Sequence, residues 1–179
     1  MTVFYIWYGL AALCAAVFAV KTYMRKGRLS ICLGNMLAAA AAVNVAYIAR
    51  MRARTYYAAS LSTSIYFICI DLMVLALVHY AIEFTESRKE PFPYKKLIYA
   101  VLDLMTLADG AFLVMNIFRE VVMRYQFNLY SVYAIKYMYV AKNGFHFHMG
   151  FVYLMLVVAT YVILLKTFSI PKIYRGRYR

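Results

Sequence analysis

The sequence predicts an all-α, polytopic membrane bundle of about five transmembrane helices. Hydrophobic residues make up 66% of the 179 positions and charged residues only 15%, whereas a soluble domain is about half apolar and a quarter charged. The apolar residues gather in five stretches of roughly 20 residues, the length that crosses a bilayer. A water-soluble core of this size cannot bury so much apolar surface, so we expect most of it to face lipid.

The expected spans end at basic residues or prolines. They cover 3–23, 29–49, 57–84, 97–118 and 148–168, within a single transmembrane domain, 1–179. No basic residue precedes the first apolar stretch, which is long enough to span. We therefore interpret it as a membrane helix and not as a cleavable signal peptide. Pro91 and Pro93 exclude a helix in the loop after the third span, and Pro171 ends the fifth.

The segment between the fourth and fifth spans, 119–147, is rich in aromatic residues and is interrupted by charges. Its partial alternation of apolar and polar residues and the turn signal Asn143-Gly144 are typical of a short β-hairpin. An interfacial helix is the alternative. We expect a partly ordered, tyrosine-rich cap on the outer membrane surface.

The formal net charge of +13 would suggest a nucleic-acid partner in a soluble protein. Here the basic residues lie between the apolar stretches, where helix ends meet lipid headgroups. We therefore expect membrane lipids, and no nucleic acid, as partners. With the N-terminus outside, 13 of the 20 Lys and Arg lie on the inner side, so the C-terminus is predicted to be cytoplasmic in the cell membrane. The outer cluster of Arg50, Arg52 and Arg54 opposes this orientation.

Three acids stand out because they fall inside expected spans: Asp71, Asp103 and Asp109. A carboxylate at bilayer depth costs at least about 2.5 kcal/mol and normally faces the bundle interior. Helical periodicity places Asp109 and Asn116 on one face of the fourth span and Asp103 on another. Because the third and fourth spans are antiparallel neighbours, we expect that Asp71 and Asp109 can meet.

The sequence offers no Lys or Arg at the depth of these acids. The carboxyls are therefore expected to be protonated, to bond with Asn44, Asn116 or hydroxyl groups, or to hold a cation or ligand. A binding site for a ligand, proton or cation and a purely structural hydrogen-bonded pair are both open interpretations. The candidate ligand-binding residues are Asp71, Asp109, Asn116 and His148.

His146 and His148 would share one face if this segment were a strand, which makes metal binding conceivable. Because no third ligand is in view, an interfacial hydrogen-bonding role is favoured, and we predict no metal ligand and no cofactor. The three cysteines, Cys14, Cys32 and Cys69, lack zinc-site spacing and are interpreted as buried hydrophobes. Familiar catalytic motifs are also missing, so no catalytic residue and no enzyme activity are expected.

Small residues recur every four positions in the second span, at Gly34, Ala38, Ala42 and Ala46. This spacing lets helix backbones approach closely in a membrane. We favour packing within the bundle over the alternative, a homodimer interface.

Two stretches resemble a known family. One is Ser-Thr-Ser-Ile-Tyr-Phe-Ile-Cys-Ile-Asp at 62–71, which runs on through His79-Tyr80 to a short polar loop. The other is Phe-His-Met-Gly-Phe-Val-Tyr at 147–153, which leads to the basic turn at 173–175. Together they are similar to the first five helices of the seven-helix membrane region found at the N-terminus of many bacterial histidine kinases and diguanylate cyclases.

This resemblance implies a sensory input module of a bacterial signal-transduction protein, responding to an unknown small-molecule or physical signal. The family's last two helices and its cytoplasmic output domain are missing, so we expect a truncated form or a stand-alone relative. The acids inside the membrane suggest an alternative, a small transport subunit that is a substrate-binding component or a proton-coupled carrier. The second to fourth spans lack the Gly and Pro breaks typical of discontinuous transporter helices.

Overall fold

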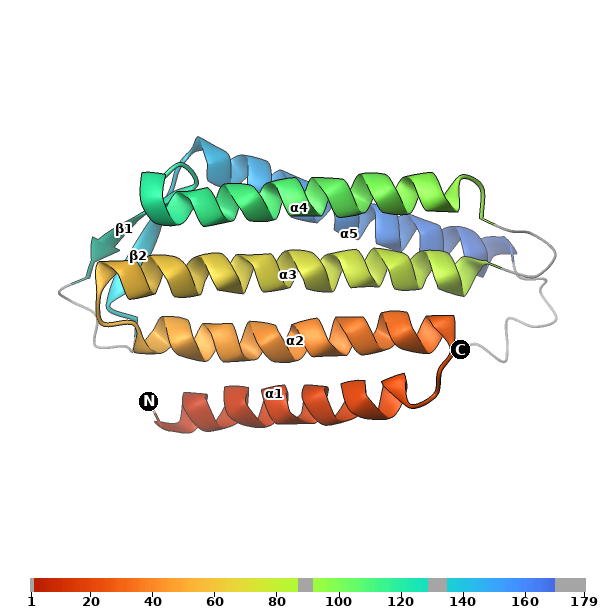
Figure 1. The fold of residues 1–179 in the computed structure, drawn as a ribbon, viewed down its shortest axis with the longest axis horizontal. Helices are drawn as coiled ribbons and strands as arrows, with labels where there is room; N and C mark the ends of the chain where they lie inside the picture. Colours follow the sequence, from red (N-terminus) through yellow and green to blue (C-terminus); the bar gives the residue numbers. More distant parts are fainter. Residues whose placement is uncertain (1, 87–91, 129–134, 170–179) are drawn as a thin grey trace.

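A computed structural model describes residues 2–86, 92–128 and 135–169, which form five helices and a two-stranded hairpin (Figure 1). The helices are α1 (Thr2–Tyr23), α2 (Arg28–Arg52), α3 (Tyr56–Thr85), α4 (Lys95–Arg119) and α5 (Asn143–Ser169), and the strands are β1 (Met123–Phe127) and β2 (Tyr137–Ala141). All five helices are long and apolar enough to cross a membrane. The chain is a multi-pass helical membrane protein, and the predicted fold class is confirmed.

Helix α3 is the centre of the bundle. Figure 1 shows α1, α2 and α3 in a row, with α4 and α5 beyond α3, and α3 contacts α2, α4 and α5. The buried share of its apolar stretch is 39%, against 11% for α1 at the edge. The buried polar side chains of α3 include Ser60, Ser64 and Asp71, and such groups normally have partners within the protein.

The hairpin lies at the end of the bundle where α3 begins, α4 ends and α5 begins (Figure 1). Strands β1 and β2 are antiparallel, with Met123 opposite Ala141 and Phe127 opposite Tyr137. The start of β1 is buried and packs against Phe67 of α3 and Leu113 of α4. Of the two alternatives for this segment, the hairpin is the one observed, and 129–134 lie outside the described residues.

Helix α5 begins five residues earlier than the expected 148. Asn143-Gly144 starts this helix, so the prediction that these two residues form a hairpin turn is wrong. At 1.5 Å per residue, His148 lies about 7.5 Å along the helix from its first residue. His146 and His148 would share a face on a strand, but they lie on helix α5, where such residues point about 200° apart. His146 is exposed and His148 is buried.

An ion-pair cluster joins α3 to α4 at the opposite end of the bundle. The Lys95 ammonium lies 2.6 Å from Glu83 Oε1 and 2.5 Å from Glu86 Oε2. The hydrogen bond from Lys95 holds the pKa of the Glu86 carboxyl, just past α3, below its usual value. These contacts fix the end of α3 against the start of α4.

The small-residue pattern of α2 lies only partly inside the bundle. Gly34 and Ala46 are buried, whereas Ala38 and Ala42 are exposed. A Cβ added at Gly34 would lie 2.6 Å from Cε1 of the Tyr23 ring. Gly34 thus permits close packing of α1 on α2, while the homodimer interface stays a prediction.

Gly144 lies where α5 meets the hairpin, and its replacement tests this junction. A Cβ there would approach the Val121 carbonyl oxygen to 2.9 Å and Val122 Cα to 3.2 Å. Because these are backbone atoms, we expect Gly144→Ala to lower the free energy of unfolding by about 1–3 kcal/mol. A Cβ at Gly150 meets nothing within 4 Å, so Gly150→Ala is the matched control. Thermal unfolding in one detergent gives the comparison, and equal stability of the two variants would contradict the observed packing.

Candidate functional site

Three ionisable side chains from three helices meet inside the bundle: Asp71 of α3, Asp109 of α4 and His148 of α5. His148 Nδ1 lies 2.6 Å from Asp109 Oδ2 and 3.7 Å from Asp71 Oδ1. Their side chains are 1%, 4% and 1% exposed, in the order Asp71, Asp109, His148. Asp71 and Asp109 are close together, as helical periodicity predicts, and His148 joins them. We call these three residues the buried cluster.

The charges of the buried cluster do not balance without a proton or a cation. Among the described residues, no Lys or Arg forms an ion pair with it. A positive charge on His148 would offset one carboxylate only. The carboxylates of Asp71 and Asp109 would also repel each other if both were charged. Two like charges this close in a region of low dielectric cannot both stay uncompensated. The second carboxyl must therefore be protonated or must bind a cation.

Several polar atoms of the buried cluster are not used by the fold. Within the described part of the chain, neither carboxyl oxygen of Asp71 has a hydrogen-bond partner, and His148 Nε2 has none. Buried polar atoms are almost always satisfied in folded proteins. Their presence here indicates capacity for a further ligand.

Aromatic rings cover His148 on the hairpin side. The His148 ring is 5.0 Å from the Phe67 ring and 6.3 Å from the Phe145 ring, measured between centroids. Tyr139 of β2 packs on both of these rings, at 6.0 Å and 5.5 Å. This packing holds the imidazole in place.

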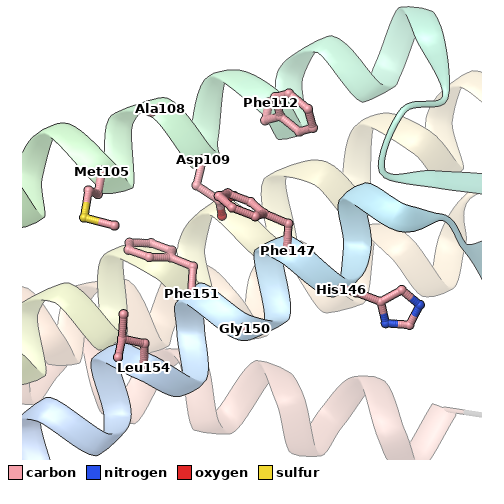
Figure 2. Close-up of a pocket in the computed structure, with 9 residues that line it drawn as sticks. All are labelled: Met105, Ala108, Asp109, Phe112, His146, Phe147, Gly150, Phe151 and Leu154. Carbon is pink, nitrogen blue, oxygen red and sulfur yellow. The ribbon is translucent and has the colours of Figure 1, made fainter.

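Two cavities reach the buried cluster from either side of α4. A cavity of about 530 Å³ between α4 and α5 has Asp109 in its wall. Figure 2 shows Asp109 projecting from α4 toward α5, where Phe147 and Phe151 line the opposite side. A second cavity, of about 390 Å³, lies between α3 and α4 and has Asp71 in its wall. Each carboxyl thus borders a different cavity.

Asn116, expected to bind a ligand, connects α4 to the hairpin. Its Oδ1 accepts hydrogen bonds from the Val122 and Met123 N–H groups, at 2.7 and 2.8 Å. Both N–H groups lie just beyond the end of α4, where the helix no longer provides acceptors. Asn44 is also occupied locally, since its Nδ2 donates to the Ala40 carbonyl at 2.7 Å. The expected bonds from these amides to the acids are replaced by the contacts with His148.

Asp103 is exposed, so the prediction that it is buried is wrong. It lies six residues before Asp109, about 240° around the helix, and therefore on another face. Its carboxylate lies 3.3 Å from His79 Nε2 of α3, with side chains 55% and 20% exposed, respectively. This pair is separate from the buried cluster.

The contact of His148 with both acids is the feature that sequence reasoning missed. Starting the fifth helix at residue 148 placed the imidazole at the membrane surface. The signal that points to the earlier start is Asn143, a residue type favoured at helix beginnings, directly before the apolar run.

Comparison with known proteins gave no match: no family model, curated protein or solved structure matches the chain. The resemblance to the sensor region of histidine kinases and diguanylate cyclases stays a prediction. The site is therefore interpreted from its own geometry.

The two backbone bonds accepted by Asn116 predict its effect on stability. Asn116→Ala would leave the buried N–H groups of Val122 and Met123 unsatisfied, at a cost of about 1–3 kcal/mol each. Asn44→Ala is the control, because it removes only a bond to its own helix. We expect Asn116→Ala to unfold at a clearly lower temperature in the same detergent. If both variants lose the same stability, Asn116 does not hold the hairpin.

Proposed function

We propose that this chain is the sensory membrane module of a bacterial signal-transduction protein, and that the buried cluster receives the signal. The observation that supports this most is the meeting of Asp71, Asp109 and His148 where no described Lys or Arg balances their charge. Ionisable residues inside membranes are costly and generally mark sites of ligand, ion or proton binding. The family resemblance of 62–71 and 147–153 points to the same role.

A change at the buried cluster would alter the forces between three helices at once. Gain or loss of a proton or cation changes the attraction that holds α3, α4 and α5 together. Of these three helices, α4 has the most room to move, because it lies between the two cavities and few of its residues are buried. Its buried residues are Thr106, Asp109, Leu113 and Asn116. Helix shifts of about 1–2 Å are a common way of passing such changes across a protein.

The direction of transmission follows from the proposed orientation. With the N-terminus outside, the hairpin lies on the outer surface, and α5 runs from the buried cluster to the cytoplasmic side. The contacts of Lys95 with Glu83 and Glu86 hold α3 and α4 together at that side. We therefore propose that the output is a displacement of the cytoplasmic end of α5 relative to α3 and α4.

The second candidate function is a proton-coupled carrier. It is favoured by one observation, that Asp109 and Asp71 border separate cavities on the two sides of α4. Two routes to one ionisable centre would allow a proton or substrate to enter by one and leave by the other. Proton flux into liposomes that is lost in Asp109→Asn would favour the carrier over the sensor.

Spin labels can detect the proposed displacement directly. The labels would be placed at Leu97 of α4 and Leu165 of α5, both exposed, in a chain with its three cysteines replaced by serine. Lowering the pH from about 8 to about 5 adds protons to ionisable groups and serves as the stimulus. We expect the distance between labels to change by about 1–2 Å or more, measured by pulsed electron paramagnetic resonance in lipid nanodiscs.

Matched variants decide whether the buried cluster causes the change. Asp71→Asn combined with Asp109→Asn should abolish the shift, because it removes the two carboxyls whose charge the buried cluster must compensate. The exposed His146→Gln should keep it. A shift that persists without the two acids, or no shift in the parent chain, would contradict the proposed sensor.

A further inference from the structure

We infer that the buried cluster binds one divalent transition-metal cation. This inference rests on the proposed role of the cluster as the receiving site and names the ligand that it takes. Sequence reasoning predicted no metal ligand, because it found no third ligand beside His146 and His148. The geometry points to a three-residue site built from α3, α4 and α5.

The ligand atoms have nearly the spacing that a metal requires. Asp71, Asp109 and His148 each offer one atom, and these atoms lie within 4.8 Å of one another. Bonds of about 2.1 Å hold neighbouring ligands of a zinc-like ion about 3–3.5 Å apart. The 3.7 Å between His148 Nδ1 and Asp71 Oδ1 is close to this, and the 2.6 Å to Asp109 Oδ2 would widen by less than about 1 Å.

The charge of the site matches a divalent ion. Two carboxylates and a neutral imidazole total minus two, so one divalent cation makes the buried cluster neutral. Without a metal, neutrality requires two bound protons in its place. Both states avoid an uncompensated charge in a region of low dielectric. Metal binding should therefore release about two protons, and lower pH should weaken it.

Asp71 is the independent evidence for a missing ligand. Its carboxyl is 99% buried by side-chain exposure, and no described residue donates to either of its oxygens. A mixed set of one imidazole and two carboxylates suits Zn²⁺, Mn²⁺, Fe²⁺ or Co²⁺ better than Ca²⁺ or Mg²⁺, which prefer oxygen ligands alone. Three protein ligands also leave a coordination position open, as in sites that exchange ligands.

The other titratable and charged groups around this end of the bundle do not compete for the ion. The titratable side chains there include Cys69 on α3, His146 on α5, Tyr125 on β1 and Tyr139 on β2. The cations at this end of α2 are Arg50, which lies 5.1 Å from the Tyr139 ring, and Arg52, which lies 5.9 Å from the Tyr5 ring. Glu120, the acid nearest the hairpin, is engaged by Tyr56, Arg124 and Lys142. Among the described residues, only the buried cluster groups three such potential ligands.

Cobalt titration tests the site in the full chain. The protein would be stripped with a chelator, placed in nanodiscs and titrated with Co²⁺, whose visible absorption reports its coordination; Zn²⁺ would then displace it. We expect one equivalent to bind, with release of about two protons near neutral pH. Asp71→Asn and Asp109→Asn, each nearly isosteric, should weaken binding by at least about 100-fold, since even outer-shell changes cost 10–100-fold.

The controls are Asp103→Asn and His146→Gln, which should bind cobalt as the parent chain does. The inference would be overturned if the parent chain does not bind cobalt, or if both Asn variants bind it as tightly as the parent chain. Circular dichroism of each variant separates loss of a ligand from loss of the fold. A folded Asp71→Asn variant that binds cobalt tightly also counts against the metal site.

If cobalt does not bind but the spin-label shift with pH persists, only the metal inference fails. If cobalt binds without moving the labels, the metal site stands and the sensor proposal fails.

Discussion

The structure depends on the contact between His148 Nδ1 and Asp109 Oδ2 at 2.6 Å, with Asp71 at 3.7 Å on the central helix. Charged groups are costly against lipid and almost always face the bundle interior, as these three do. This requirement fixes the rotation of α3, α4 and α5 about their axes and leaves their apolar faces to the membrane. Helices α1 and α2 are packed by another principle, the close approach of small residues such as Gly34.

Residues outside the buried cluster determine its geometry. Asn116 accepts two backbone hydrogen bonds at the end of α4 and so holds the hairpin over the bundle. The hairpin and the first turn of α5 then place Tyr139 and Phe145 beside Phe67, and these rings enclose the imidazole. A segment that resembles a surface loop in the sequence is thus a support for buried chemistry. Burial of the tyrosine ring raises the pKa of the Tyr125 hydroxyl on β1, which agrees with a dry interior beneath the strands.

The five helices, and the approach of Asp71 to Asp109, could be predicted from the sequence. Lipid forces each span to satisfy its own backbone, so hydropathy alone locates five helices. Periodicity also brings Asp71 and Asp109 toward each other. Periodicity could not locate the beginning of α5, because its first turn, Asn143 to His146, is polar and has the composition of a loop. Packing against the hairpin is what makes this turn helical. That error hid the contact of His148 with the two acids. The exposure of Asp103 depends on how α4 packs against α3, which the periodicity of one helix does not reveal.

A double-mutant cycle between Asp109 and His148 tests most directly whether buried charges compensate each other. Asp109→Asn, His148→Gln and the double variant would be unfolded with denaturant in chelator-treated micelles. Because each single change leaves an unpaired group in the interior, we expect the double variant to lose about 1–3 kcal/mol less than the sum of the single losses. Losses that add within about 0.5 kcal/mol would contradict this account, since the two side chains would then contribute independently.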